Sequence, residues 1–466
     1  MPYFNPPGLS PIALEFDPDG VWALACSLVR ECLSKAGLSG ADIAAVSTTG
    51  QRGGMALLDR NGKELYAGPN RDVRAFFEGM AIDEGLGEQV YKLTGHMPSF
   101  LFAPARLAWF RANAPETAGK IAHLLPLGDW LGLRLSGEIR GERSAVTELG
   151  LLPVSDSEPR DAVSTLLGID SSLMPHASFA GEQTGEVNAA TAAETGLSTG
   201  APVIAGGPDT QCGLLGMGVT EAGELGILVG WSGPLQMVTS SPCIDLEGRT
   251  WTGRHILEDR WVLESTTTEA GRSLDWACET LGFPKHGMAF NPREPASSET
   301  YTPFAFMGPR IMDAKRLGIQ MGGMLFPTPV GHTDISRRGL ANAALKNLAF
   351  AIRGNAIQLE EISGRRPVDI ALGGGVTGIG GFPQLVADTL AREITVPWER
   401  DATLLGSAVC AAVGSGAYNS LPEAARAMMD EGETLSPDGA RAEDLEEECE
   451  EWLDLYERLA EITGRM

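Results

Sequence analysis

Cysteine and histidine are scarce in this sequence, and neither occurs in a metal-ligand pattern. The seven cysteines are scattered without a C-x-x-C pair and the six histidines show no ligand spacing, which argues against a structural zinc site. An odd, dispersed set of cysteines indicates reduced thiols. The N-terminus lacks a basic region followed by an apolar run, and no stretch reaches transmembrane length. We therefore expect a cytoplasmic protein without a membrane partner.

Basic residues are also in deficit. Lysine and arginine number 36 against 61 aspartates and glutamates, which gives a formal net charge of −25. This balance argues against a nucleic-acid partner, because phosphate backbones are bound by clustered Lys and Arg. A phosphorylated ligand must instead be held by backbone amides, by a metal ion or by a few placed cations.

The chain is long and ordinary in composition. Its 466 residues exceed what one hydrophobic core organises, so we expect two or more domains with a ligand cleft between them. A content of 43% hydrophobic and 21% charged residues is typical of a soluble globular protein.

One stretch in the middle of the chain combines a strand, glycines and a lone acid. An apolar run at 203–205 meets Gly206, Gly207 and Pro208 and then delivers a single carboxylate, Asp209. Glycines allow the backbone to bend there or to approach a ligand closely. We interpret Asp209 as the candidate catalytic base. The alternative is ordinary turn chemistry, in which an Asp after a strand caps the next helix.

Two later stretches repeat this pattern of strand and glycine turn. The predicted strand 225–229 leads into Gly230, Ser232 and Gly233, whose backbone N–H groups suit a phosphate. A lone G-x-S-G is a weak signal, and the hydrolase elbow G-x-S-x-G is not met. The apolar run 370–372 meets three further glycines, which we interpret as a ledge for a nucleotide base or ribose; the alternative is a tight turn without a ligand. These glycines are Gly373, Gly374 and Gly375.

Polar groups gather at two breaks in the N-terminal half. Hydrophobic spacing predicts a helix over 21–36, a strand over 43–47 and a second strand from 55 into an Asn-Gly turn. Gln51 and Arg52 lie between these strands, at a strand end where α/β folds place ligands. The next loop presents an amide, a carboxylate and guanidinium groups, which indicates either a hydroxyl-reading cluster or a solvated helix start. Its residues are Asn70, Asp72 and Arg74.

The other segments are expected to pack rather than to carry chemistry. Residues 119–200 are predicted to pack in the N-terminal half and to carry little chemistry. Helices are predicted over 214–219, 340–352, 382–390 and 404–413, and an acidic C-terminal helix is predicted to turn its carboxylates to solvent.

Taken in order, these motifs resemble those of the FGGY carbohydrate kinase family, whose members phosphorylate sugars and polyols with ATP. The resemblance runs from about Glu15 to the C-terminal helix. Each motif alone is weak, and their ordered set is specific. The motifs are Thr49-Gly50-Gln51, 70–74, 206–209, 230–233, Gly331-His332-Thr333 and 373–375.

The resemblance implies an α/β fold of two actin-like, ribonuclease-H-like ATPase domains. Residues 1–216 would form the sugar-binding domain and 217–466 the nucleotide-binding domain, with the active cleft between them. It further implies an ATP- and Mg²⁺-dependent kinase for a small sugar or polyol, such as a ketose, a sugar alcohol or an autoinducer-2-like compound. A homodimer is one expected assembly.

The resemblance also assigns site residues position by position. Asp209 matches the base that removes the proton from the acceptor hydroxyl, and it is expected to contact the metal ion indirectly. The substrate side matches Gln51, Arg52, Asn70, Asp72 and Arg74. The ATP side matches Gly230, Ser232, Gly233, Gly373, Gly374 and Gly375.

Three departures from the family pattern bear on function. Trp231 stands where a Thr is usual in the second phosphate loop. Arg52-Gly53 and Asn70 differ from the xylulokinase pattern and look closer to the autoinducer-2 kinase branch. Family members also begin with a strand hairpin bearing Asp-x-Gly-Thr, and the first residues here match the region just after it. Two hypotheses therefore stay open: a kinase whose given start is truncated, and a catalytically impaired pseudokinase that binds sugar or nucleotide.

Overall fold

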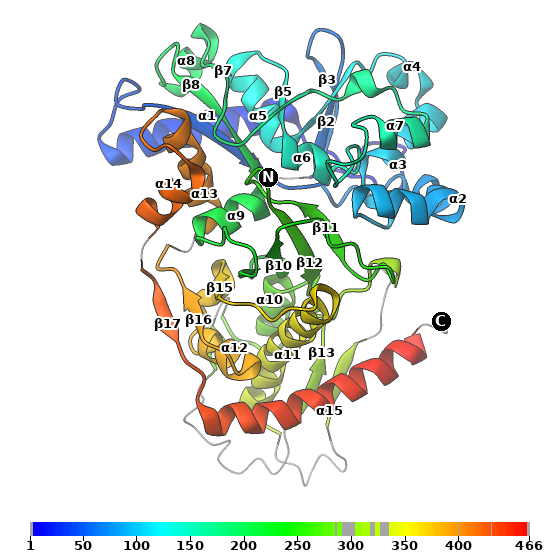
Figure 1. Cartoon of the computed structure of the whole chain (residues 1–466), viewed down its shortest axis with the longest axis vertical. Coiled ribbons are helices and arrows are strands. Elements are labelled where there is room, and N and C mark those ends of the chain that lie inside the picture. Colours follow the sequence, from blue (N-terminus) through cyan, green and yellow to red (C-terminus); the bar gives the residue numbers. More distant parts are fainter. Residues whose placement is uncertain are drawn as a thin grey trace. The chain divides into compact units, whose positions relative to one another are not determined.

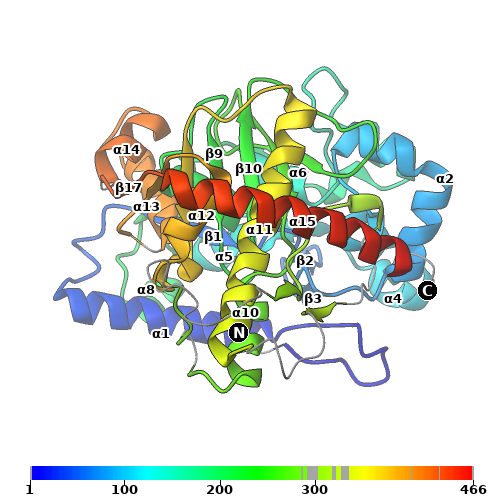
Figure 2. The same cartoon turned by 90° about the horizontal axis from the view of Figure 1, so that it is seen from below.

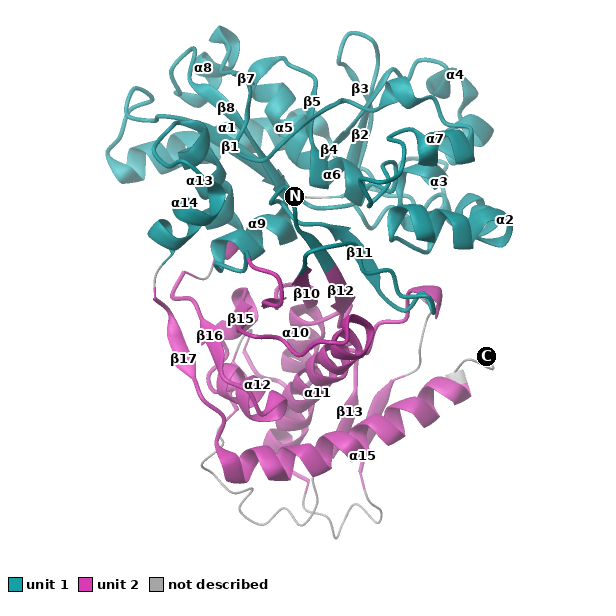
Figure 3. Cartoon of the chain, in the orientation of Figure 1, with its two compact units in different colours: residues 1–220, 239–262, 403–429 teal, residues 221–238, 263–402, 430–466 magenta. Residues whose placement is uncertain are grey.

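The computed structural model describes residues 3–284, 287–290, 303–316, 322–326, 335–399, 401–429 and 431–463. The chain forms two compact units, which Figure 3 distinguishes by colour. Unit 1 comprises residues 1–220, 239–262 and 403–429, and unit 2 comprises 221–238, 263–402 and 430–466. Unit 1 includes residues 239–262 and 403–429, which come after the domain boundary between 216 and 217 that the sequence predicts. That boundary stays a prediction.

Unit 1 combines many helices with short strands (Figure 1). Its strands are β1 (Val46–Gly50), β2 (Met55–Leu58), β3 (Glu64–Gly68), β4 (His123–Pro126), β5 (Arg140–Glu142), β6 (His176–Ser178), β7 (Gln183–Glu186), β8 (Pro202–Pro208) and β11 (Trp251–Arg254). Its helices are α1 (Pro18–Ala36), α2 (Phe76–Thr94), α3 (Ala103–Asn113), α4 (Pro115–Ala118), α5 (Leu127–Ser136), α6 (Arg143–Glu148), α7 (Ala162–Leu167), α8 (Ala189–Thr195), α9 (Asp209–Gly216), α13 (Ala402–Gly414) and α14 (Leu421–Met428).

The strands of unit 1 form small sheets. β1 pairs in parallel with β8, and β7 pairs with β8 on its other side, antiparallel. β2 lies between β3 and β4 and is antiparallel to both. Successive side chains of a strand point to opposite faces, so a central strand without polar residues needs cover on both sides. Met55 and Leu57 of β2 lie in one apolar cluster with Phe110, whereas Leu58 lies in another with Trp130.

Unit 2 is built on a sheet with the strand order β12-β10-β9-β15-β16-β17. β9 and β15 are parallel neighbours, and β10 is antiparallel to β9. The strands are β9 (Leu225–Leu228), β10 (Pro234–Thr239), β12 (Trp261–Thr266), β13 (Phe304–Phe306), β14 (Gly323–Leu325), β15 (Ile370–Gly373), β16 (Ile394–Val396) and β17 (Glu433–Leu435). The helices are α10 (Gly271–Thr280), α11 (Arg337–Ser363), α12 (Phe382–Leu390) and α15 (Gly439–Thr463).

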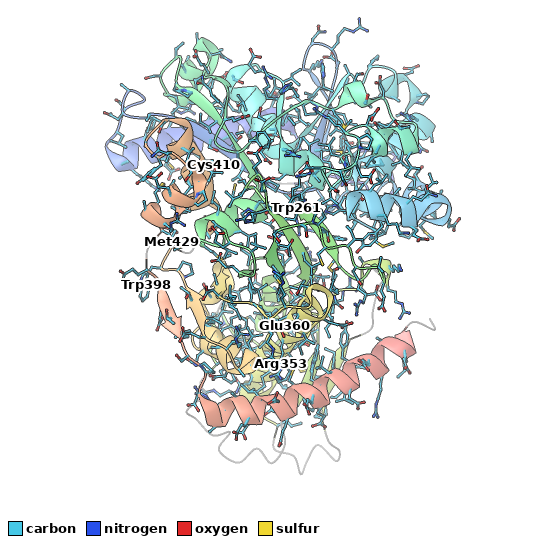
Figure 4. All side chains as sticks on the ribbon, viewed as in Figure 1. Trp261, Arg353, Glu360, Trp398, Cys410 and Met429 are labelled. Carbon is cyan, nitrogen blue, oxygen red and sulfur yellow. The ribbon has the colours of Figure 1, made fainter. Side chains whose placement is uncertain are left out.

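The acidic C-terminal helix α15 crosses α11 (Figure 2). Arg353, labelled on α11 in Figure 4, donates a hydrogen bond to Glu446 of α15 at 2.7 Å. Trp452 lies on the apolar stripe of α15 and is fully buried. Its ring stacks on Phe306 with 5.5 Å between centroids, and its indole N–H donates to the carbonyl of Ala305 at 3.0 Å. The stripe therefore anchors an otherwise acidic helix.

The helix after the strand β8 begins earlier than the sequence predicts. The expected span is 214–219, but α9 begins at Asp209 and ends at Gly216. Pro208 has an extended backbone with ψ of 150°, and the next residue enters the helix directly. A carboxylate in the first turn is stabilised by the positive end of the helix dipole, which favours this early start.

Two further expectations concern the chain as a whole. The predicted motif Gly331-His332-Thr333 lies outside the described residues. Across the part of the chain that the structure describes, every helix is too short or too polar to cross a bilayer.

We expect Trp452→Ala to destabilise the protein by about 3–5 kcal/mol, because it removes a buried ring and the stacking of that ring on Phe306. Chemical unfolding followed by circular dichroism measures this change. Trp276→Ala is the matched control, since the Trp276 side chain is 55% exposed. Equal losses in the two variants would contradict the anchoring role of Trp452.

Candidate active site

Asp209 lies at the edge where two parallel strands end. It follows β8, whose neighbour β1 places Thr49 opposite Gly207, and the Thr49 hydroxyl donates to the Gly207 carbonyl at 2.9 Å. The strands approach closely, because an added Cβ at Gly206 would lie 2.1 Å from the carbonyl oxygen of Thr48. Parallel strands end at the same edge of a sheet, so the loop after β1 reaches Asp209.

The carboxylate of Asp209 is anchored through one of its two oxygens. Oδ1 accepts hydrogen bonds from the backbone N–H of Arg52 at 3.2 Å and of Thr210 at 2.9 Å. Oδ2 accepts no hydrogen bond from the described residues. Because the side chain is half-buried rather than enclosed, Oδ2 is available to a ligand hydroxyl.

The surroundings of Asp209 make its carboxylate a better base than an ordinary Asp. Burial raises the pKa of Asp209 above its usual value, and the charge of Glu148 adds to the rise. Arg52 and the two backbone donors act in the opposite direction without cancelling it. A higher pKa means a stronger affinity for a proton, which suits general-base catalysis near neutral pH.

A buried cluster of charges extends from Arg52. Nη1 of Arg52 lies 3.5 Å from Oε2 of Glu148, whose side chain is only 3% exposed. The same Oε2 lies 3.3 Å from Nε2 of His96. Burial alone would raise the pKa of Glu148, but His96 and Arg52 outweigh it and hold the pKa below its usual range. Glu148 is therefore ionised, and its negative charge balances the positive charge of Arg52.

Trp251 of β11 packs against this cluster. The guanidinium carbon of Arg52 lies 5.4 Å from the centre of the Trp251 ring, within the range of a cation–π interaction. The indole N–H donates to the carbonyl of Met97 at 2.6 Å, which fixes the ring. The rings of His96 and Phe102 pack beside it at 6.0 and 5.8 Å between centroids. Arg52 is thus held by both charge and packing.

Sequence patterns do not single out Glu148, His96 or Trp251. Glu148 belongs to the segment 119–200, which the sequence predicts only to pack, and that prediction is incomplete for this residue. One signal was present: a lone carboxylate within the apolar run 145–152. A carboxylate that the fold buries needs a partner, because an unpaired buried charge is strongly unfavourable.

Gln51 and Asn70, both expected on the substrate side, are brought together next to Arg52. The side-chain oxygen of Gln51 accepts a hydrogen bond from the backbone N–H of Asn70 at 3.2 Å. Gly53 has a φ of +73°, and an added Cβ there would lie 3.3 Å from Cβ of Asn70. The two loops are therefore joined, and both side chains are half-buried.

Asp72 and Arg74 occupy a separate buried cluster. Oδ2 of Asp72 accepts from the Tyr66 hydroxyl at 2.5 Å and from Nε of Arg74 at 2.7 Å, and Arg74 also pairs with Glu15 at 2.8 Å. Burial alone would lower the pKa of Arg74, but Asp72 above all reverses this and the pKa lies above its usual value. These side chains hold the loop in place, and their role in reading substrate hydroxyls stays a prediction.

In unit 2, the two predicted glycine turns leave the same edge of the sheet. β9 and β15 are parallel neighbours with Leu228 opposite Gly373, and the N–H of Val229 donates to the Gly373 carbonyl at 2.8 Å. Gly374 has a φ of +96°, and an added Cβ there would lie 2.5 Å from the Val229 carbonyl oxygen. Only glycine fits this position without strain.

A third segment, which sequence patterns do not single out, runs along the turn at 230–233. Backbone N–H groups of Thr267, Ala270 and Gly271 donate to the carbonyls of Gly233, Trp231 and Gly230 at 3.0, 3.1 and 3.0 Å, respectively. These bonds fix the carbonyl side of the turn. The backbone N–H groups of Ser232 and Gly233 have no acceptor among the described residues. Such unpaired N–H groups are what a phosphate binds.

Two further carboxyl groups are enclosed near β8. The N–H of Glu142 donates to Oδ2 of Asp129 at 2.9 Å, and Oε2 of Glu142 accepts from Ser144 and Ala145 at 2.6 and 2.8 Å. An added Cβ at Gly207 would lie 3.7 Å from this Oε2. Burial raises the pKa of Glu142 to about 7, and burial together with Glu142 raises the pKa of Asp129 well above its usual value.

Two family models match this chain. The N-terminal domain of the FGGY family of carbohydrate kinases matches residues 9–216, and the C-terminal domain of that family matches residues 227–415. An autoinducer-2 kinase from Klebsiella pneumoniae subsp. pneumoniae is 27% identical over 469 residues, which cover 96% of this chain and 86% of that protein. These matches give no support to the hypothesis of a pseudokinase.

Solved structures share the fold. A ligand-bound xylulose kinase from Lactobacillus acidophilus matches with a TM-score of 0.85 at 17% identity, covering 100% of this chain and 93% of that one. Plasmodium falciparum glycerol kinase with ADP matches with a TM-score of 0.80 at 17% identity, covering 97% and 91%. The likeness confirms the predicted α/β fold with two domains and is consistent with the actin-like ATPase fold.

We expect the stability of the protein to fall as the pH rises from about 4.5 to about 7 through Glu142. The pKa of Glu142 is higher in the folded state, so between these two pH values the folded state binds more protons than the unfolded state. The stability of the folded state is therefore greater below this pH range than above it. Each unit of pKa difference corresponds to about 1.4 kcal/mol. Glu142→Gln, which can still accept both hydrogen bonds, should gain about 2 kcal/mol relative to wild type between pH 5 and pH 8.

Melting curves at a series of pH values test this expectation. Glu138→Gln is the control, because that side chain is exposed. A melting temperature of Glu142→Gln that tracks wild type in parallel at every pH would contradict the assignment.

Proposed function

This chain belongs to the FGGY family of carbohydrate kinases, and we propose that it transfers the γ-phosphoryl group of ATP to a hydroxyl of a small sugar or polyol with Asp209 as the general base. The observation that carries this proposal is the placement of Asp209. Its Oδ1 is held by two backbone N–H groups, whereas Oδ2 is left to a ligand, and its pKa is raised by burial.

The reaction balances with these groups. The acceptor hydroxyl gives its proton to Oδ2 of Asp209 as its oxygen forms a bond to the γ-phosphorus. The bond from the γ-phosphorus to the bridging oxygen breaks, and ADP leaves. Positioning and charge stabilisation supply most of the acceleration in phosphoryl transfer, so the base needs only to accept a proton late in the step.

The substrate side is assigned to the loops next to Asp209. The side chain of Arg52 is 15% exposed, and its guanidinium is assigned to a substrate oxygen; Gln51 and Asn70 are half-buried beside it. A site that hydrogen-bonds a hydroxyl rejects analogues that lack it, because its own polar groups would be left unpaired. Among the acceptors that the proposal covers are ketoses, sugar alcohols and autoinducer-2-like compounds, and the relative that acts on autoinducer-2 favours the last of these.

The nucleotide side is assigned to the glycine turns of unit 2. The N–H groups of Ser232 and Gly233, which have no acceptor among the described residues, suit phosphate oxygens. The adenosine part is assigned to the turn at Gly374, which packs closely against Val229. The glycerol kinase of similar fold was solved with ADP, which supports a nucleotide ligand for this chain as well. Backbone donors also fit a chain with a net charge of −25, which has few cations to spare.

Mg²⁺ fits the same proposal. Among the described residues no group of three or more His, Cys, Asp and Glu side chains is placed to hold a metal ion. Mg²⁺ keeps several waters and is bound by one or two carboxylates together with substrate phosphates, so a dedicated cluster is not required. Asp209 would contact it indirectly, through water. When bound, the ion neutralises charge on the phosphate oxygens.

We expect Asp209→Asn to lower kcat by about 10²–10⁴-fold while acceptor binding stays within a few-fold of wild type, because the amide keeps the shape but accepts no proton. A coupled assay of ADP formation measures kcat, and calorimetry measures binding. Asp259→Asn, on an exposed side chain, makes the same change in charge as a control. Retained turnover in Asp209→Asn would remove Asp209 from the role of base.

We expect Gly374→Ala to raise KM for ATP by about tenfold or more, with a smaller effect on KM for the acceptor. The new Cβ would meet the Val229 carbonyl at 2.5 Å and the φ of +96° is strained for alanine, so the turn must move. At Gly323 an added Cβ meets no atom within 4 Å, and Gly323→Ala is the control. An unchanged KM for ATP in Gly374→Ala would place the nucleotide elsewhere.

A further inference from the structure

We propose that Glu148 determines the charge preference of the acceptor site: by neutralising Arg52 from behind, it selects uncharged sugars and polyols and rejects sugar acids. This inference rests on the proposed function, since it concerns the acceptor that Asp209 deprotonates. Glu148 is 3% exposed and lies behind Arg52, so it acts through that guanidinium rather than by touching the substrate.

Glu148 and Arg52 form a direct ion pair. Glu148 Oε2 lies 3.5 Å from Nη1 of Arg52, and the Arg52 side chain is 15% exposed. Arg52 therefore presents donors to a ligand while its net charge is compensated within the protein. The backbone N–H of the same residue holds Asp209. One residue thus links the base, the buried acid and the substrate side.

The position of Glu148 is fixed from several directions. Nε2 of His96 lies 3.3 Å from Oε2, and Nδ1 of His96 lies 2.7 Å from the carbonyl of Thr94. Gly253 closes the opposite side, because an added Cβ there would lie 2.2 Å from Oε1. A larger residue at 253 would displace the carboxylate. The chain therefore uses a glycine and a buried histidine to keep one carboxylate beside Arg52.

The described charges around Arg52 are largely paired within the protein. Asp209 and Glu148 place two carboxylates beside the guanidinium of Arg52 and the imidazole of His96. Arg74 is paired with Asp72 and Glu15, and Arg254, next to Gly253, is paired with Asp156 at 2.5 Å. Arg71 is exposed, where solvent and salt screen its charge.

This balance discriminates between two classes of acceptor. A neutral hydroxyl can donate to Asp209 and accept from Arg52 without opposing any charge. The carboxylate of a sugar acid would instead meet two carboxylates and a guanidinium that already has a partner. Like charges placed together are a common way for a site to exclude a wrong ligand.

The test compares acceptors of equal length that differ only in charge. Neutral polyols and ketoses of four to six carbons and the matching aldonates are offered to wild type and to Glu148→Gln. Turnover is measured by ADP formation and binding by calorimetry. Wild type should prefer the neutral acceptors, and the neutral-to-acid ratio of both kcat/KM and affinity should fall by about tenfold or more in Glu148→Gln.

Three further variants separate charge from shape. Glu148→Asp keeps the charge and should keep the ratio. Gly253→Ala displaces the carboxylate from its place beside Arg52 without removing it, so it should lower the neutral-to-acid ratio in the same direction as Glu148→Gln but by less. Glu64→Gln removes a carboxylate that pairs with Arg134 at 2.8 Å, and it should leave the ratio unchanged.

The outcomes separate this inference from the proposed function. A wild type that prefers aldonates, or a ratio unchanged in Glu148→Gln, overturns the role of Glu148 while kinase activity stands. Absent turnover with the expected shift in binding preference supports Glu148 and overturns the proposed function. Should Glu148→Gln fail to fold in melting curves, an unchanged neutral-to-acid ratio in Gly253→Ala overturns the inference, and a lower ratio supports it.

Discussion

The parallel pairing of β1 with β8 is the constraint on which the candidate site depends. Neither strand carries much chemistry, but their common end sets the loop of Gln51 and Arg52 against the first turn of α9. The approach requires glycine at Gly206, since any side chain there would strike β1. Once this edge is formed, the backbone N–H of Arg52 orients Asp209 without the use of a charged side chain, and the guanidinium pairs with Glu148.

Three carboxyl groups near this edge have different pKa shifts, because their surroundings differ. Asp209 is half-buried, and Arg52 and two backbone donors offset only part of the effect of burial, so its pKa is raised. Glu148 is more deeply buried, yet Arg52 and His96 keep its pKa low. Glu142 has backbone and hydroxyl donors but no close cation strong enough to offset burial, and its pKa rises to about 7. The sign of each shift follows from which of desolvation and pairing is larger.

Unit 2 uses the same strand geometry with different donors. β9 and β15 end together as parallel neighbours, and glycine turns follow both. Here the backbone supplies the chemistry, because three carbonyls of the turn at 230–233 accept from the segment 267–271, whereas the N–H groups of Ser232 and Gly233 have no acceptor among the described residues. A strongly acidic chain can bind phosphate in this way without a basic patch. Acidic composition and a phosphorylated ligand are therefore compatible.

The sequence by itself determined the strand and glycine junctions, the α/β class, the family and the residue proposed as base, because these depend on local patterns and on their order along the chain. Periodicity also located the long helices α11 and α15, though it placed the start of α9 five residues late. Only the tertiary structure decided that Glu148, His96 and Trp251 gather behind Arg52, and that Asp72 and Arg74 pair with each other. The contacts behind Arg52 join residues far apart in sequence, whereas Asp72 and Arg74 are neighbours in one loop whose burial the local pattern left open. No local pattern states which charges the fold will bury together.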